Sequence, residues 1–184
     1  MACLITKGRL INCSDVQGGI SALYITNGVG GYGAITEASD AISDMAGTFT
    51  AFKYDVNGAG NSFTTTATTS KDTGTTFFST VLSVTLPKLS KEDRAEFTLL
   101  AYGRCSIVAA DRNGNAFLIG KENGCTVTSA VITSGDARGD MQGTVIEFLA
   151  EEGQAPDFIN GATAANPFAG MSSATATITV GTNS

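Results

Sequence analysis

The segment LPKLSKEDRAEFTLLAYGRCSIVAADRNGNAFLIG, residues 86–120, decides the fold of this chain. Pro87 has no N–H to donate to a neighbouring strand, so it ends the segment that precedes it. The hydroxyl of Ser90 can accept a hydrogen bond from the free amides of a first helical turn. Glu92 and Asp93 then place negative charge at the positive end of the helix dipole. We therefore expect a helix to begin near residue 90.

This helix also has a marked apolar side and a marked end. Phe97, Leu100 and Ala101 follow the i, i+3, i+4 spacing of one helical stripe. Gly103 stands where a left-handed C-cap is needed. No other segment marks both ends of a helix in this way. We predict a single helix over about 90–102, lying across a sheet.

A short hairpin follows the helix. Cys105–Ala110 and Ala116–Gly120 are apolar runs of strand length. The turn between them contains Asn113-Gly114, and Asn-Gly is typical of a type I′ turn, in which both central residues adopt a positive φ. We therefore predict a hairpin closed by a turn of this type.

A longer hairpin precedes the helix. Phe63–Ser70 is rich in threonine, Lys71–Gly74 forms the turn, and Thr75–Leu86 returns with strict alternation of side-chain type. Alternate residues of a strand point to opposite faces, so this ribbon has one polar face and one mixed face. Such an element either projects from the body of a protein or lines a surface.

Most of the remaining chain also carries strand patterns. Further strands are expected at Ile20–Thr26, Thr48–Val56, Cys125–Thr133, Thr144–Ala150 and Ala174–Val180, the last as an edge strand. Residues 34–46 fit either an amphipathic helix or a hairpin, and residues 153–173 resemble a loop. About eight strands and one helix predict a mainly β fold, an antiparallel β-sandwich or half-barrel with a flanking helix and a long hairpin. We expect one domain over 1–184, with an N-terminal arm at 1–12 and a C-terminal extension at 159–184.

Composition narrows the classes of function. The 184 residues are 42% hydrophobic and 15% charged, which is typical of a folded domain and not of a disordered chain. The net charge of −6 and the scattered basic residues argue against nucleic-acid backbone as a ligand. The N-terminus lacks the apolar core of a signal peptide, and no apolar run is long enough to span a membrane. We expect synthesis in a reducing cytoplasm.

The side chains that usually carry chemistry are sparse. There is no histidine, which removes the commonest general base. Glu151 and Glu152 are adjacent on a strand end and therefore point to opposite faces. Asp111 and Asn113 resemble the start of a calcium loop, but the spacing stops there and the hairpin explains both. We expect no catalytic, cofactor-binding or metal site, and no enzyme.

The four cysteines give no reason to change this view. They are Cys3, Cys13, Cys105 and Cys125, and no two are close in sequence. Zinc sites and redox motifs usually contain a closely spaced pair. We interpret these residues as small buried thiols.

Two short motifs suggest other functions. Gly28–Gly33 matches G-x-G-x-x-G after an apolar strand, with Asp55 at the end of the next strand, as in a dinucleotide-binding turn. No second βαβ unit supports that interpretation. Arg138-Gly139-Asp140 matches a tripeptide used by some adhesion ligands, but three residues match often by chance.

The order of the motifs, more than any single one, resembles a known family. An early glycine pair leads into an Ile/Tyr strand, and a Thr-rich hairpin, a short helix, an Asp-Arg-Asn-Gly turn and a Gly-Asp loop follow. These motifs are Gly18-Gly19-Ile20, Gly74–Phe78, Leu86–Leu89, Gly103-Arg104, Asp111–Gly114, Gly120–Gly124, Val127–Ser129, Gly135–Gly143 and Glu151-Glu152 before Pro156. Over roughly residues 8–158 the chain resembles the tail tube proteins of tailed bacteriophages. The segment after Pro156 departs from the pattern.

The resemblance implies a structural protein that assembles with itself. In that family the long hairpin joins those of neighbouring subunits, six copies close a β-barrel ring, and stacked rings form the tube through which DNA passes. The residues expected at the inter-subunit hairpin are Phe63, Thr65, Thr76, Phe78, Leu82 and Val84. The partners would be copies of the chain, other tail or neck proteins, and viral DNA that passes without specific binding. Loops and termini would make the ring-to-ring contacts.

The resemblance leaves some roles open. Related proteins form neck or tail-terminator rings, and a head-decoration protein displaying Arg138–Asp140 is a further alternative. The expected location is the virion tail, with the host cytoplasm as the site of assembly. A dinucleotide bound at Gly28–Gly33 is the alternative outside this class.

Overall fold

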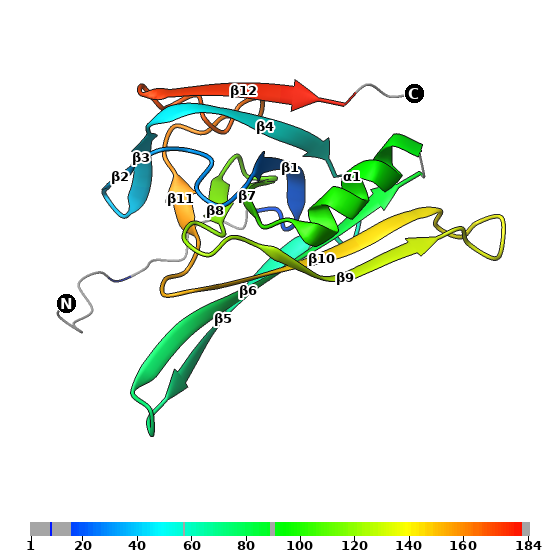
Figure 1. The fold of residues 1–184 in the computed structure, drawn as a ribbon, viewed down its shortest axis with the longest axis horizontal. Helices are drawn as coiled ribbons and strands as arrows, with labels where there is room; N and C mark the ends of the chain where they lie inside the picture. Colours follow the sequence, from blue (N-terminus) through cyan, green and yellow to red (C-terminus); the bar gives the residue numbers. More distant parts are fainter. Residues whose placement is uncertain (1–7, 9–15, 57, 89–90, 182–184) are drawn as a thin grey trace.

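The computed structural model describes residues 8, 16–56, 58–88 and 91–181, without the side chains of 91–94. The described residues form twelve strands and one helix (Figure 1). In chain order these are β1 (Ile20–Asn27), β2 (Ile35–Ala38), β3 (Ala41–Met45), β4 (Gly47–Asp55), β5 (Ser62–Ser70), β6 (Thr75–Pro87), α1 (Lys91–Tyr102), β7 (Cys105–Asp111), β8 (Ala116–Ile119), β9 (Thr126–Thr133), β10 (Gly143–Glu152), β11 (Asp157–Ile159) and β12 (Ala174–Val180).

The strands form two sheets. A curled sheet has the order β12-β4-β1-β7-β8-β11-β3-β2, and a second sheet has the order β5-β6-β10-β9. The second sheet is antiparallel throughout. The expected fold class, mainly β with a sandwich or half-barrel, one flanking helix and a long hairpin, is confirmed. The expected number of strands was too low.

The first hydrophobic core lies between the two sheets. The curled sheet contributes one face of β1, β7 and β8, and the second sheet contributes the alternate residues of β6 and β10. Its buried members include Leu23, Ile107, Ile119, Leu82, Val84, Ile146 and Phe148. Burying a side chain of this size stabilises a fold by about 1.5–3 kcal/mol, so this layer holds the sandwich together.

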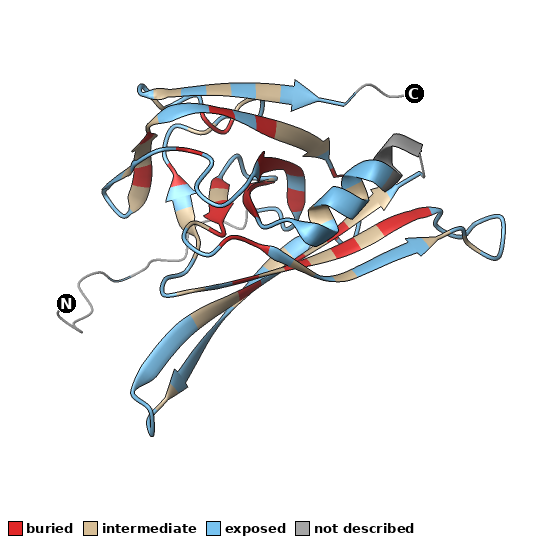
Figure 2. Cartoon of the chain, in the orientation of Figure 1, coloured by how far each residue is buried: buried red, intermediate tan, exposed pale blue. Residues whose placement is uncertain are grey.

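A second core fills the other side of the curled sheet. Tyr24, Phe49 and Phe168 meet there edge to face, with ring centroids 6.3 Å apart for Tyr24–Phe168 and 5.1 Å apart for Phe49–Phe168. β1 and β7 therefore have both faces covered, which explains their nearly continuous apolar sequences (Figure 2). Phe168 lies in a segment expected to be a loop, so part of the C-terminal extension belongs to the core.

The ambiguous residues 34–46 form a hairpin and not a helix. β2 and β3 pair with each other, and the turn between them is made by Ser39 and Asp40, with φ of 57° and 63°. Two successive positive φ values are those of a type I′ turn.

The Asn113-Gly114 turn differs from its prediction. Gly114 has a φ of 85°, but Asn113 is not in the left-handed region, so a type I′ turn was wrong. The Asp111 side chain stabilises another geometry: its Oδ1 accepts from the amides of Asn113 at 2.8 Å and of Asn115 at 2.7 Å. This Asx arrangement closes the hairpin.

The predicted helix is confirmed as α1, with two corrections near its C-terminal end. Phe97 and Leu100 pack against the first core, but Ala101 is exposed. Gly103 is not left-handed; its amide donates to the Leu99 carbonyl at 3.0 Å, so the helical hydrogen bonding simply runs on to this residue. Ser90, the expected cap, lies outside the described residues, as does the arm at 1–12 apart from Gly8.

The C-terminal part holds a missed strand and an unexpected direction. β11 is only three residues long and pairs with β3 and β8. β12 is an edge strand, as predicted, but it pairs with β4 in parallel. Within the described residues no helix is long and apolar enough to cross a membrane.

One carboxylate fixes the start of β12. Asp44 of β3 accepts hydrogen bonds from the Ser172 and Ser173 amides, both at 3.1 Å, and from the Ser172 hydroxyl at 2.8 Å. Bonds from Ser173 and Ser172 lower the pKa of Asp44 to about 2. The charged form of Asp44 thus stabilises the attachment of the C-terminal segment.

Replacing Leu82 by alanine should destabilise the protein far more than replacing its neighbour. Leu82 has no exposed surface, whereas Val81 is 42% exposed on the opposite face of β6. We expect Leu82→Ala to lower the free energy of unfolding by about 2–5 kcal/mol, and Val81→Ala by less than about 1 kcal/mol. Urea unfolding measures both, and equal losses would contradict the burial described above.

Asp44→Asn should change how stability depends on pH. The folded pKa of Asp44 lies below its unfolded value, so its contribution is present above the unfolded pKa and is lost as the pH falls towards 2. The wild type should therefore be the more stable at pH 6, and the difference should shrink between pH 4 and pH 2. Thermal unfolding across this range tests the expectation, which fails if the difference is constant.

Candidate functional site

The β5–β6 hairpin extends past the sheet that anchors it. The last pair between β6 and β10 is Phe78–Glu152, whereas β5 and β6 continue to pair as far as Ser70–Thr75. Residues 68–77 are therefore a two-stranded tip, which projects from the body in Figure 1. A two-stranded ribbon is marginally stable by itself in water, so this tip lacks the support that a third strand would give.

The six residues expected at the inter-subunit hairpin share one face, which is turned towards the body. Leu82 and Val84 are buried in this chain's own core, and Phe63 and Phe78 are half-buried. The Phe63 ring centroid lies 5.1 Å from that of Phe117. The hydroxyls of Thr65 and Thr80 are 2.9 Å apart, and Thr76 donates to Thr69 at 3.2 Å in the tip. These side chains anchor the hairpin, and its role between subunits stays a prediction.

The opposite face of the four-stranded sheet is open to solvent. It carries threonine and serine on β5, β6 and β9, the carboxylates of Glu147 and Glu151 on β10, and a few apolar side chains. The exposed apolar residues on this face are Phe77, Val81 and Val131. None of the four strands contains lysine or arginine. The result is a polar, weakly acidic wall.

Within the residues that the structure describes, neither edge of this sheet pairs with a further strand. β5 is one edge and β9 the other, and neither strand carries a charged side chain. Val131 and Ile132 of β9 are 53% and 51% exposed. Proteins that remain monomeric usually protect such edges with charges, proline or short strands, because a free edge pairs with other chains. β9 was predicted as a strand, but its place at an edge was not.

The curled sheet gives a partial contrast. Its β2 edge is four residues long and carries Glu37, which accepts a hydrogen bond from the Lys121 ammonium. Its β12 edge is uncharged. Only the four-stranded sheet has two long uncharged edges among the described strands. Because its four strands alternate in direction, β5 and β9 run in opposite directions.

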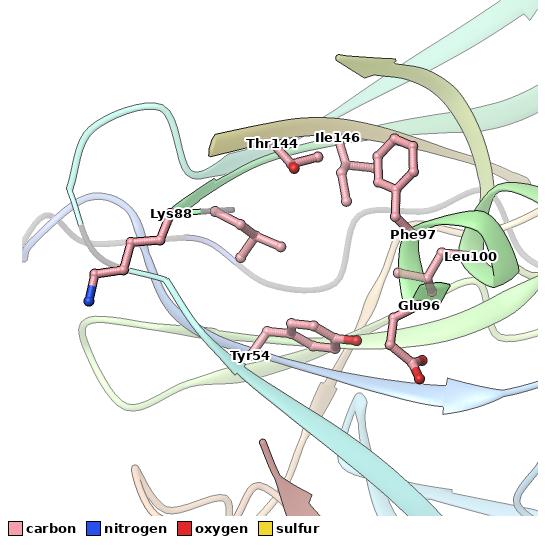
Figure 3. A pocket seen from close by; sticks show the side chains of 8 residues that line it. Tyr54, Lys88, Glu96, Phe97, Leu100, Thr144 and Ile146 are labelled. Atoms are coloured by element: carbon pink, nitrogen blue, oxygen red, sulfur yellow. The ribbon is translucent and has the colours of Figure 1, made fainter. Parts of the chain in front are cut away.

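A small cavity lies where α1 meets both sheets. Tyr54, Leu86, Phe97, Leu100 and Ile146 line it, and Lys88 and Glu96 stand at its mouth (Figure 3). Its volume of about 20 Å³ holds roughly one water molecule. The helix thus packs against both sheets at this point. The cavity is too small for an organic ligand.

The glycine-rich motif at Gly28–Gly33 and the Arg138–Asp140 motif both lie in loops. The first described element after Gly33 is strand β2 and not a helix, so the Gly28–Gly33 loop does not have the strand–turn–helix layout that places a pyrophosphate at a helix N-terminus. Asp140 Oδ2 accepts from the amides of Ala137 at 2.7 Å and Asp136 at 3.0 Å, so one oxygen of this carboxylate shapes its own loop. In the part of the chain that the structure describes, no three acidic, cysteine or histidine side chains gather as metal ligands would.

Comparison with protein-family models, curated proteins and solved structures finds no match to this chain.

Removing the hairpin tip should leave the fold intact. Replacing Thr68–Phe77 with Asn-Gly joins Ala67 to Phe78 by a two-residue turn, and almost all the removed side chains are exposed. We expect the free energy of unfolding to change by less than about 1 kcal/mol. Circular dichroism and urea unfolding measure this, and an unfolded product would show that the tip supports the body.

Proposed function

We propose that this chain is a structural virion protein of the phage tail tube type, which assembles with itself into rings that stack around a lumen. The four-stranded sheet would form the wall of each ring. The observation that carries the proposal is the pair of long, uncharged, unpaired edges on this one sheet. The order of sequence motifs, which resembles that family, supports the same function.

The strand directions are compatible with ring closure. If copies are related by rotation about one axis, the β9 edge of one copy meets the β5 edge of the next. These strands run in opposite directions, so the new pairing would be antiparallel, like every other pairing in the sheet. The contact is head to tail, and such contacts make rings when the rotation closes. With six copies, as the resemblance implies, the barrel would have more than roughly twenty strands and a wide aqueous channel.

The chemistry of the exposed face suits a conduit. Its threonines, serines and glutamates are hydrophilic, and none of the four strands carries a lysine or arginine that would bind phosphates. DNA would pass along such a wall without specific binding. The protein would act in the virion tail after assembly in the host cytoplasm.

Two related functions would use the same sheet. A neck or tail-terminator protein would close a ring but would not stack into a long tube. A head-decoration protein would display the Arg138–Asp140 loop, whose Asp140 carboxylate is partly engaged in its own turn. Negative-stain images of the purified protein separate tubes from single rings.

The tip-shortened variant should fold but fail to form rings. Its β5 edge is too short to pair fully with β9 of a neighbour, whereas the point variant Asp72→Asn keeps the strand length and serves as the control. Sedimentation velocity and negative-stain microscopy measure assembly. Rings formed by the shortened chain at wild-type concentrations would overturn the assignment of this hairpin.

A variant on the other edge sharpens the same test. Ile132 lies on the helix side of β9 and is half exposed, so a strand of a neighbouring copy would bury it. Ile132→Lys should therefore weaken assembly at least tenfold, because it would bury a charge. Ile132→Val keeps an apolar side chain and should not weaken assembly. Mixed together, the shortened chain and Ile132→Lys each retain one intact edge. A head-to-tail contact predicts one-to-one dimers that do not grow, and rings or an inert mixture would refute it.

A further inference from the structure

Two cysteines that are far apart in sequence lie opposite one another in the fold. Cys105 is the first residue of β7, and Cys125 directly precedes β9. The Cys105 amide donates to the Cys125 carbonyl at 3.3 Å, and the Cys125 amide donates to the Cys105 carbonyl at 2.7 Å. The two residues therefore form an antiparallel, doubly hydrogen-bonded pair.

Their side chains enter the same core. Directly opposed residues of an antiparallel pair point to the same face, and both cysteines belong to the core between the sheets. Both are free thiols, 6% exposed for Cys105 and 1% for Cys125. In pairs of this type the Cα atoms are about 5.5 Å apart, which lies inside the range of about 4.4–6.8 Å that disulfides span.

The Cys125 thiol makes a weak hydrogen bond to the end of β8. Its Sγ donates to the Ile119 carbonyl at 3.5 Å. The neighbouring Gly120 leaves space for this sulfur, because a Cβ there would come within 2.8 Å of it. Rotation about the Cys125 Cα–Cβ bond would break this contact and free the sulfur to react.

We propose that Cys105 and Cys125 are a site of reversible oxidation, at which a small peroxide cross-links β7 to the start of β9. The Cys105 thiolate attacks one peroxide oxygen, the O–O bond breaks, and hydroxide leaves and takes up a proton to give water. Cys125 sulfur then attacks the resulting sulfenic acid, the S–S bond forms, and the S–O bond breaks with loss of a second water. Two thiols are oxidised and one peroxide is reduced.

Burial and strand geometry indicate which cysteine reacts first and how stable the resulting disulfide is. Cys105 is the more exposed of the two, so it reacts first, and burial raises the pKa of its thiol to about 11, which makes the first step slow at neutral pH. Hydrogen-bonded pairs hold their Cβ atoms further apart than an unstrained disulfide does. The cross-link is therefore strained and easily reduced.

The cross-link would join the two sheets. β7 lies near the middle of the curled sheet, and β9 is an edge of the four-stranded sheet. A bond at this point would fix the beginning of that edge to the body. The proposal does not depend on ring assembly and can be tested on the monomer.

Peptide mapping of the full wild-type chain tests the proposal. Trypsin places the four cysteines in four different peptides, with Cys105 in residues 105–112 and Cys125 in residues 122–138. After treatment of the folded protein with hydrogen peroxide and alkylation, the linked pair 105–112/122–138 should exceed any other cysteine pairing by at least about tenfold. Dithiothreitol should abolish it.

A sulfenic-acid probe gives the matched control. Dimedone should label Cys105 in Cys125→Ser, where no second thiol resolves the sulfenic acid, and should leave Cys105 unlabelled in the wild type. Predominant pairing with Cys3 or Cys13 would overturn the proposal. So would thiols that stay fully alkylated after peroxide, or equal dimedone labelling of the wild type and the variant.

Discussion

The pairing of β6 with β10 is the interaction on which the rest of the structure depends. It runs over ten consecutive residue pairs, from Phe78–Glu152 to Pro87–Gly143. Strand alternation sends Leu82 and Phe148 into the core and leaves the intervening residues on the open face. β6 carries the long hairpin and β10 carries the β9 edge, so both free edges are positioned by this ladder. Its end requires glycine at 143, because a Cβ there would overlap the Leu86 carbonyl oxygen.

Elements with strong local signals could be predicted from the sequence, and elements defined by distant neighbours could not. Capping residues mark the helix, and turn residues and strict alternation mark the long hairpin. The β2–β3 hairpin has no such local signal. Ile35, Ala38 and Ile42 fit a helical period, and its turn uses Ser39 and Asp40 in place of the usual glycine.

The parts of the candidate site differ in the same way. The threonine-rich ribbon and its alternating faces follow from local sequence. That β9 lies at the opposite edge follows from the strand order β5-β6-β10-β9, which brings together segments far apart in the chain. The approach of Cys105 to Cys125 has the same origin, because the tight turn after β8 returns the chain to β7. No spacing rule for nearby cysteines would detect it.

The parallel pairing of β12 with β4 has a consequence for biosynthesis. Ala174 pairs with Gly47, a residue that leaves the ribosome more than a hundred residues earlier. Until β12 arrives, β4 exposes a backbone edge and the aromatic core beneath it lacks Phe168. Contacts of such high sequence separation form slowly and leave incomplete chains prone to misassembly. During translation, the nascent curled sheet therefore stays incomplete until the C-terminal segment has been made.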